Sequence, residues 1–376
     1  MPHVRPHGRT AVFALVGDVT GSSRALRQLR ALSAMGVATE VLQTARPRDP
    51  DAVPGVTLTV LGPSSGTGPA AFWSAHRAIA AASRRRPAGL YLASDLYSLP
   101  ALAAAADRHG GALVYDAREL YAALDSSAGR PWVSAVWGAV ERRFIARADA
   151  VLTVSDGIAD RLAETTGVAR PTVLFNAPGP SRPRDRGELA RALALPDDGR
   201  VVVLYQGLFR RGRGLETLVE GVRAVGGVRL VLVGEGVLED ELRASGKDLG
   251  DRLVLHPFVP PDRLADLTPG ADLGACLIEP VTESLRLSMP NKLFEYLSAG
   301  VPVLASPLPE IRAVVGQGVG VLADPSDPAA VADALRQSLA PGLRAGWSAM
   351  AAGVLDRYSW DRGRLAFRAL IDRLLP

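Results

Sequence analysis

The stretch from Ser288 to Ser306, SMPNKLFEYLSAGVPVLAS, specifies a loop, a helix and a strand in immediate succession. Pro290 stands where the helix begins, because its fixed φ and missing N–H cost nothing in a first turn. Gly300 stands where the helix ends, because glycine takes the left-handed conformation there without strain. The apolar run at 301–305 then predicts a buried strand whose proline is confined to its start.

The N-terminus of this helix also predicts an anion site. Its free N–H groups and the positive end of its dipole favour a phosphate or diphosphate. Glu295 lies about one turn inside the helix, where its carboxylate can accept hydrogen bonds from a ribose diol beside that diphosphate. An anion site next to a carboxylate that binds a diol is what a nucleotide requires.

This segment resembles the donor-binding signature of the retaining GT-B glycosyltransferases of family four, the glycosyl transferases group 1. That family has a carboxylate at the position of Glu295 and an opening like Pro290, Asn291 and Lys292. The resemblance covers nearly the whole chain. It implies transfer of a sugar from a nucleotide diphosphate sugar to an acceptor, with retention of configuration and without a metal or other cofactor.

Composition and length limit the classes of protein that fit. A chain of 376 residues, 48% hydrophobic and 22% charged, is long enough for two domains and typical of a globular protein. A formal net charge of +4 argues against a nucleic-acid partner, but it suits an anionic substrate or an acidic membrane surface. The one cysteine, Cys276, lies in an apolar run and is expected in the core. With no secretory leader or spanning helix expected, we predict a cytoplasmic protein, with contact at the inner face of the membrane left open.

Short apolar strands alternate with amphipathic helices along both halves of the chain, which predicts an α/β fold with two doubly wound parallel sheets. With the resemblance, this gives the GT-B architecture of two Rossmann-like domains facing a cleft. We expect an acceptor-side domain at 1–178 and a nucleotide-sugar-binding domain at 179–358. Residues 178–196, rich in proline and charge, are interpreted as the connection. A final helix within 359–376 is expected to cross back to the N-terminal domain, as in the family.

The glycine-rich segment QGLFRRGRG at 206–214 follows a predicted strand and opens a helix. Such a turn lets a phosphate approach the backbone, and guanidinium groups can bind it bidentately. The family commonly has an arginine just after the first glycine and a lysine just before the last, where this chain has Leu208 and Arg213. Arg213 is therefore predicted to stabilise the leaving diphosphate, with Arg210 or Arg211 in place of the missing arginine. The alternative is a solvated basic loop.

Further donor contacts follow from the resemblance. Gly234 lies in a Gly-x-Gly turn, and His256 lies in a segment that contacts the base, although a structural role for this histidine is the alternative. Many relatives have a second glutamate eight residues before Glu295, where this chain has Leu287; Glu279 or Glu283 are candidate replacements. The predicted donor-binding set is Glu295, Asn291, Lys292, Leu293, Gly207, Arg210, Arg211, Gly234 and His256.

In the N-terminal half, Arg118 stands where the family usually has a histidine near the transferring centre. Arginine cannot act as a base at neutral pH. In the front-face mechanism ascribed to retaining GT-B enzymes, the leaving phosphate assists the acceptor proton, so the protein mainly positions substrates and stabilises charge. Arg118 and Arg213 are the predicted catalytic residues. Gly17, Asp18 and Asp95 are expected on the acceptor side, with capping of the following helix as the alternative for Asp95.

Two alternatives remain open at this stage. The segment 132–147 interleaves aromatic and arginine residues, which indicates either a membrane-surface helix or a helix packed on the sheet. Arg118 and Leu287 also fit a catalytically inactive GT-B protein that retains a nucleotide pocket. The sequence does not identify the sugar, the base or the acceptor, which is a carbohydrate, a small molecule or a lipid-linked molecule.

Overall fold

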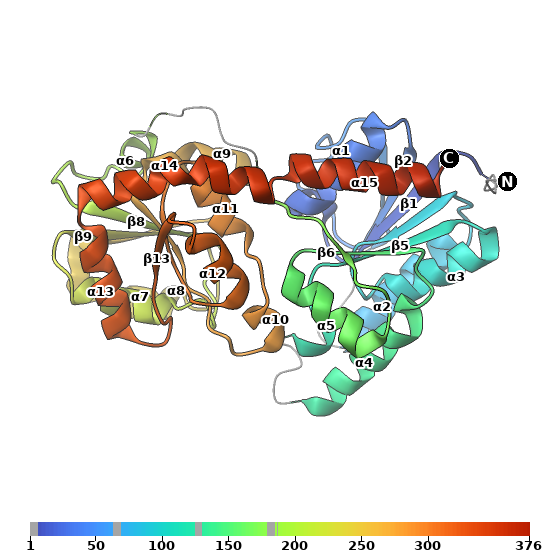
Figure 1. The fold of residues 1–376 in the computed structure, drawn as a ribbon, viewed down its shortest axis with the longest axis horizontal. Helices are drawn as coiled ribbons and strands as arrows, with labels where there is room; N and C mark the ends of the chain where they lie inside the picture. The colour runs from blue at the N-terminus through green and yellow to red at the C-terminus, as the bar shows by residue number, and fades with distance from the viewer. Residues whose placement is uncertain (1–6, 63–68, 125–129, 179–184, 186) are drawn as a thin grey trace. The chain divides into compact units, whose positions relative to one another are not determined.

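The computed structural model describes residues 7–62, 69–124, 130–178, 185 and 187–376 (Figure 1). The chain forms two compact units. The first extends to Asn176 and also includes Trp360–Pro376, and the second is Ala177–Ser359. Each unit is a parallel sheet with helices on both of its faces (Figure 1). The predicted pair of doubly wound sheets is therefore confirmed.

The sheet of the first unit has the strand order β3-β2-β1-β4-β5-β6-β7, so the order reverses between β1 and β4. Its strands are β1 (Thr10–Leu15), β2 (Ala38–Gln43), β3 (Val56–Val60), β4 (Leu90–Ala93), β5 (Ala112–Ala117), β6 (Ala150–Thr153) and β7 (Thr172–Val173). The helices of this unit are α1 (Ser23–Ala34), α2 (Pro69–Ser83), α3 (Leu99–His109), α4 (Pro131–Ile145), α5 (Asp156–Thr166) and α15 (Trp360–Leu374).

The sheet of the second unit has the order β10-β9-β8-β11-β12-β13 and reverses between β8 and β11. Its strands are β8 (Val201–Gln206), β9 (Val228–Val233), β10 (Leu253–His256), β11 (Leu273–Cys276), β12 (Val303–Ala305) and β13 (Gly320–Leu322). Its helices are α6 (Glu188–Ala192), α7 (Leu215–Arg223), α8 (Glu239–Ser245), α9 (Pro261–Leu267), α10 (Glu283–Arg286), α11 (Asn291–Ser298), α12 (Pro309–Val315), α13 (Pro328–Ser338) and α14 (Pro341–Tyr358).

Helix α11 starts and ends as the sequence predicts. Pro290 is its N-cap, and Gly300 has a φ of 73° just past its C-cap. The N–H of Gly300 bonds the carbonyl of Leu297, and that of Val301 bonds the carbonyl of Tyr296, which is the Schellman arrangement. Because this motif uses the N–H of Val301, β12 begins two residues later than predicted, at Val303.

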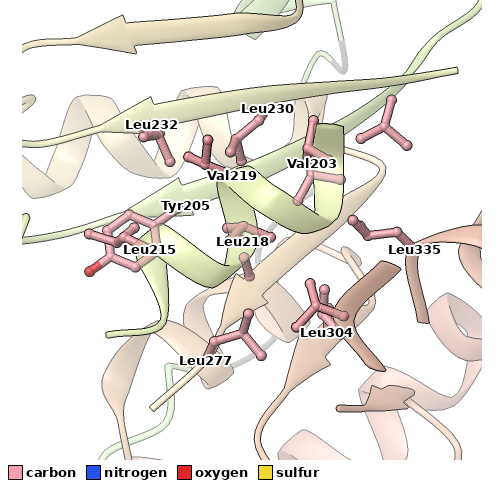
Figure 2. Close-up of a cluster of buried hydrophobic side chains, with 14 of the residues drawn as sticks. Val203, Tyr205, Leu215, Leu218, Val219, Leu230, Leu232, Leu277, Leu304 and Leu335 are labelled. Atoms are coloured by element: carbon pink, nitrogen blue, oxygen red, sulfur yellow. The ribbon is translucent and has the colours of Figure 1, made fainter. Parts of the chain in front are cut away.

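Each unit has its own cluster of buried hydrophobic side chains. Figure 2 shows the cluster of the second unit, where Leu215, Leu218 and Val219 of α7 meet side chains from β8 and β9. Cys276 is fully buried, as expected. In the first unit α15 contributes to the core through Trp360, Phe367, Ile371 and Leu374. Among the described residues, none of the helices is both long enough and apolar enough to span a bilayer.

The predicted connection at 178–196 is partly wrong. Residues 179–184 and 186 of this segment lie outside the described part of the chain. Residues 1–6, where no secretory leader is expected, also lie outside it. The rest of the segment contains α6, and the side chain of Leu189 on this helix is fully buried. A five-residue helix presents too short a pattern to be recognised among prolines and charges.

Helix α11 is attached to the sheet through Tyr296. The Tyr296 hydroxyl accepts a hydrogen bond from the N–H of Gln206 (3.0 Å), at the end of β8. Its ring lies flat against Gly274 of β11, where a β-carbon would come within 2.3 Å of the ring. Glycine at 274 is therefore what lets this aromatic ring, and the helix that carries it, approach the sheet.

We predict that Gly274→Ala destabilises the protein by about 1–3 kcal/mol, because the added methyl forces Tyr296 and α11 outward. Urea unfolding of both proteins measures the change. The matched control is Gly353→Ala in α14, where a β-carbon meets nothing within 4 Å. That change should leave stability equal or raise it by up to about 1 kcal/mol, since alanine favours helix. Equal stability of wild type and Gly274→Ala would contradict the proposed role of the glycine.

Candidate functional site

The candidate site of the second unit lies at the point where its strand order reverses. Ligands of doubly wound sheets bind beyond the carboxyl ends of the strands at such a point. Here β8 leads into the loop at 207–214, and its neighbour β11 leads towards α10 and α11. The topology therefore brings together the glycine-rich loop and the signature helix, which lie about eighty residues apart in the sequence.

Glu295 is held by a neighbour on β8. Its Oε2 accepts a hydrogen bond from Nε2 of Gln206 (2.6 Å). The Oε1 of Gln206 in turn accepts a hydrogen bond from the hydroxyl of Thr268 (3.1 Å). Gln206 is almost fully buried, whereas Glu295 stays partly exposed. The carboxylate is thus oriented by a buried amide, and its residue is partly exposed at the surface of the site.

The glycine-rich loop is joined to the turn after β9. The N–H of Gly207 bonds the carbonyl of Val233, and the N–H of Phe209 bonds the carbonyl of Glu235 (2.8 Å). A β-carbon on Gly234 would lie 1.9 Å from the carbonyl oxygen of Gly207. Gly234 is therefore required by the close approach of two backbones, whether or not a phosphate touches it.

Glu279 holds the far end of the same loop. One of its carboxylate oxygens accepts a hydrogen bond from the N–H of Gly214 (3.3 Å), and its own N–H bonds the carbonyl of Gly212. Glu283, the other candidate replacement, forms an ion pair with Arg286 (3.7 Å) on α10. Leu287 closes α10 and is buried, with 7% of its surface exposed. The geometry therefore gives Glu279 a loop-fixing contact rather than the place of the family glutamate.

Cationic side chains gather beside Tyr205 at the end of β8. The Nζ of Lys292 lies 3.6 Å from the centroid of the Tyr205 ring. Burial raises the pKa of the Tyr205 hydroxyl, and the positive charges of Arg213 and Arg210 act against that rise. Arg213 is partly buried and Arg210 is exposed. Arg211 turns to the surface: its side chain is 74% exposed and pairs with Glu216 and Glu241.

The remaining predicted donor residues take different places. Asn291 is exposed at the first position of α11. Leu293 is fully buried, and its N–H bonds the carbonyl of Pro290, so it contributes packing rather than a ligand contact. The carbonyl of His256 accepts the N–H of Gly234 (3.0 Å), and its ring faces the carbonyl of Pro257. Through these contacts His256 connects the end of β10 to the turn after β9, which is a structural role.

In the first unit Asp95 joins two strand ends. Its carboxylate accepts hydrogen bonds from the N–H of Val16, after β1, and from the N–H of Ser98, before α3 (2.7 Å each). The N-cap of α3 is Ser98 itself, so Asp95 fixes the turn that precedes this helix and is not its capping residue. Burial raises the pKa of Asp95, while the charge of Arg118 and these bonds act in the opposite direction.

Gly17 and Asp18 shape the turn after β1. Gly17 has a φ of 129°, and its N–H bonds the hydroxyl of Thr44 (2.9 Å). The carboxylate of Asp18 caps a short 3-10 helix, Val19–Gly21, and accepts the N–H of Arg48 (3.0 Å). Both residues therefore hold the loop that follows the first strand.

Arg118 follows β5 next to a buried ion pair. Arg24 binds the carboxylate of Asp116 through two nitrogens, and Gln28 donates to the same carboxylate (2.8 Å). Burial by itself raises the pKa of Asp116, but Arg24, together with Arg118 and Gln28, lowers the pKa below its usual value. Arg118 donates to the Ser22 hydroxyl (3.3 Å), while its buried Nε has no partner among the described residues.

Sequence reasoning missed the residues that orient the others. Gln206, Tyr205 and Tyr296 stand in recognised motifs, but their roles depend on which strands are neighbours. The pair of Arg24 and Asp116 also escapes prediction, because the two residues are 92 positions apart. A polar residue at the last position of an otherwise apolar strand, as Gln206 is on β8, was the available signal.

Two family models match the chain. The model described as "Glycosyl transferases group 1" matches residues 200–340, and the model described as "Glycosyl transferase 4-like domain" matches residues 20–179. The chain is also 30% identical over 243 residues to the D-inositol 3-phosphate glycosyltransferase of Acidothermus cellulolyticus. That match covers 59% of this chain and 52% of the relative, so the chain spans about half the length of this curated protein.

Solved structures show the same fold. The sucrose-phosphate synthase of Thermosynechococcus elongatus superposes with a TM-score of 0.80 at 20% identity, covering 97% of this chain and 98% of that one. The Anabaena protein HepE in complex with UDP-glucose superposes with a TM-score of 0.77 at 16% identity, covering 96% and 99%. These likenesses confirm the predicted GT-B fold class.

Proposed function

The chain belongs to the group 1 glycosyltransferases, and on that premise we propose that it transfers a sugar from a nucleotide diphosphate sugar to an acceptor hydroxyl. The observation that carries the proposal is the Glu295 carboxylate, oriented by Gln206 one turn inside α11. Beside it lie the N-terminus of that helix and the side chains of Lys292 and Arg213. A carboxylate suits the ribose diol, and the positive groups suit the diphosphate.

The donor base is the first open variable. HepE, which shares the fold, is described in complex with UDP and with UDP-glucose. Uridine diphosphate and UDP-glucose are therefore the first ligands to try on this chain. The carboxylate and cations would hold any nucleoside diphosphate through its ribose and phosphates, so guanosine, adenosine and thymidine diphosphates belong in the same panel.

The proposed reaction proceeds with retention. The bond between the anomeric carbon and the β-phosphate oxygen breaks, and the acceptor oxygen bonds to the same face of that carbon. The acceptor proton passes to the leaving phosphate oxygen. Arg213 and the helix N-terminus stabilise the negative charge that grows on the diphosphate. Since side-chain cations supply this stabilisation, the proposed reaction needs no metal ion.

On the acceptor side, Arg118 offers a guanidinium group that suits a phosphate or carboxylate of the donor or the acceptor. The curated relative is named for D-inositol 3-phosphate, a phosphorylated molecule. An acceptor with an anionic group is therefore the class we favour. The alternative is an inactive nucleotide-binding protein. It is favoured by Arg118, which stands where the family usually has a histidine, and by Leu287, which stands where many relatives have a glutamate.

We further propose that α4 contacts an anionic membrane surface. Its Trp132 and Val136, one turn apart, are 62% and 53% exposed. Arg142 and Arg143 are exposed in its last turn. The one carboxylate of this helix, Glu141, is buried and accepts the Tyr115 hydroxyl (2.7 Å). An exposed face that is apolar and cationic without negative charge matches the interface of an anionic bilayer.

The opposite face of α4 packs against the unit. Trp137 lies 5.0 Å from Tyr97 and 5.8 Å from Phe72 between ring centroids. Helix α4 therefore packs against α2 and the loop before α3, and the proposed surface role concerns only the residues that this packing leaves outside. A cytoplasmic location at the inner face of the membrane remains our proposal, since the buried thiol of Cys276 suits a reducing compartment.

Nucleotide binding tests the donor site. A diphosphate held at about 100 times its dissociation constant should stabilise the wild type by about 2.7 kcal/mol, which raises its melting temperature. The Glu295→Ala variant should lose this shift, whereas Glu239→Ala on α8, which removes a surface partner of Arg243, should keep it. Thermal denaturation with each of the four nucleoside diphosphates measures the change in melting temperature. Unchanged affinity in Glu295→Ala would remove the ribose assignment.

Arg118 is tested by comparing transfer with binding. We expect Arg118→Ala to reduce release of nucleoside diphosphate from UDP-glucose, with an inositol phosphate as acceptor, by about 100-fold or more. Nucleotide affinity should change far less. The rate should be equal with and without EDTA. Equal losses of transfer and binding would make Arg118 a structural residue, and nucleotide binding without transfer to any acceptor would favour the inactive alternative.

Vesicle sedimentation tests the membrane contact. Vesicles that contain phosphatidylglycerol should bind the protein, and pure phosphatidylcholine vesicles should bind it weakly. The double change Trp132→Ser and Val136→Ser should weaken binding about ten-fold, the equivalent of about 1.4 kcal/mol. Leu365→Ser on α15, a residue 64% exposed, serves as the control and should bind like wild type. The proposal would be contradicted if the protein bound equally to both kinds of vesicle, or if the double variant bound as tightly as the wild type.

A further inference from the structure

Lysine is rare in this chain. Of its 43 lysine and arginine residues only Lys247 and Lys292 are lysine, so arginine serves as the cation almost everywhere. Lys247 is exposed at the start of a 3-10 helix, whereas Lys292 is the second residue of α11 and lies in the candidate site. Lysine differs from arginine in carrying a compact charge that can be lost near neutral pH. The choice of lysine at 292 therefore calls for a physical reason.

The ammonium group of Lys292 lies against the glycine-rich loop. A β-carbon placed on Gly207 would come within 3.4 Å of Nζ, so the group rests beside the residue that precedes Leu208. Leu208 is 55% exposed and occupies the place where the resemblance implies an arginine. Lys292 thus brings a positive charge from α11 to the part of the loop that lacks one. Arg211, a replacement expected from the sequence, is engaged with Glu216 and Glu241 instead.

The surroundings of Lys292 favour an anion. The Nζ of Lys292 stacks on the ring of Tyr205, 3.6 Å from its centroid. Arg213 and Arg210 of the loop repel its charge, and Glu295, on its own helix, attracts it more weakly than burial opposes it. Burial together with these cations lowers the pKa of Lys292 to about 7. The Cys276 thiol, the remaining titratable neighbour, has its pKa raised by burial to about 11 and stays neutral.

We propose that Lys292 is the second diphosphate-binding cation of the donor site, in place of the arginine absent at 208, and that it takes up a proton when the diphosphate binds. This role rests on the proposed function and adds a pH dependence to it. An anion binds the charged form, so the diphosphate raises the pKa of Lys292. Affinity is then greatest below the pKa of the free protein, about 7, and falls as pH rises above it.

Carbon-13 NMR observes this group directly. Labelling lysine with carbon-13 at Cε gives one resonance for Lys247 and one for Lys292. The resonance that disappears in Lys247→Met belongs to Lys247, and the other belongs to Lys292. In the free protein the Lys292 resonance should titrate near pH 7. With saturating uridine diphosphate or inorganic pyrophosphate its midpoint should rise above about 9. Lys247, which is exposed on a different element, serves as the internal control, and the ligand should leave its resonance unchanged.

Calorimetry measures the same event as proton uptake. At pH 8, in two buffers of different ionisation enthalpy, the wild type should take up about 0.9 proton for each uridine diphosphate bound. Above pH 7.5 its affinity should fall about ten-fold per pH unit. Lys292→Met should take up no proton and bind more weakly at pH 7. Lys292→Arg should bind without uptake, because arginine stays charged, and Lys247→Met should behave like wild type.

The outcomes separate this role from the donor-site proposal. Nucleotide binding with no change in the Lys292 titration would overturn the role of Lys292 and leave the donor site standing. A response to pyrophosphate, with no binding of any nucleotide, would support Lys292 as a diphosphate cation and overturn the nucleotide function. Failure of both pyrophosphate and the nucleotide panel to bind would overturn both.

Discussion

The attachment of α11 to the sheet is the constraint on which the candidate site depends. Gly274 leaves room for the Tyr296 ring, and the Tyr296 hydroxyl receives the N–H of Gln206. The same Gln206 then holds Glu295 with its side-chain amide. One residue at the end of β8 therefore fixes both the helix and the carboxylate that the helix presents. Because the contacts share a residue, a shift of α11 would disturb the position of Glu295 as well.

The electrostatics of the site follow from that placement. Once α11 lies against β8 and β11, Lys292 comes to rest on Tyr205, close to Arg213 and Arg210. Cations held close together repel one another, and a bound diphosphate relieves the repulsion. The free protein thus keeps a site whose charge is complementary to the ligand before the ligand arrives. Such preorganisation lowers the cost of binding.

The first unit uses its buried charges differently. Arg24 satisfies Asp116, and the Asp95 carboxylate joins the ends of β1 and β4 through backbone N–H groups. These paired groups stiffen the carboxyl edge of the sheet, next to Arg118, which follows β5. An arginine in this setting stays charged at any physiological pH, so it can bind an anion but cannot exchange protons with the acceptor. The proposed mechanism accordingly assigns the proton to the leaving phosphate.

Local sequence determined the elements and the signature helix of this protein. Pro290 and Gly300 bound α11 through backbone conformation, and the alternation of strands and helices predicts two doubly wound sheets, because both depend on short-range geometry. Glu295 and Arg213 are predicted in the same way, through recognised motifs. The short α6 was missed, since five residues carry too little periodicity.

Tertiary structure alone settled which of the candidate residues share a site. The contact of Gln206 with Glu295 spans 89 positions, and the approach of Lys292 to Gly207 depends on which strands are neighbours. Sequence spacing holds no information on such contacts, because the strand order of a sheet brings distant segments together. The packing of α11 beside β8 places Lys292, and not Arg211, next to the start of the loop that contains Leu208. The sequence does not indicate this packing.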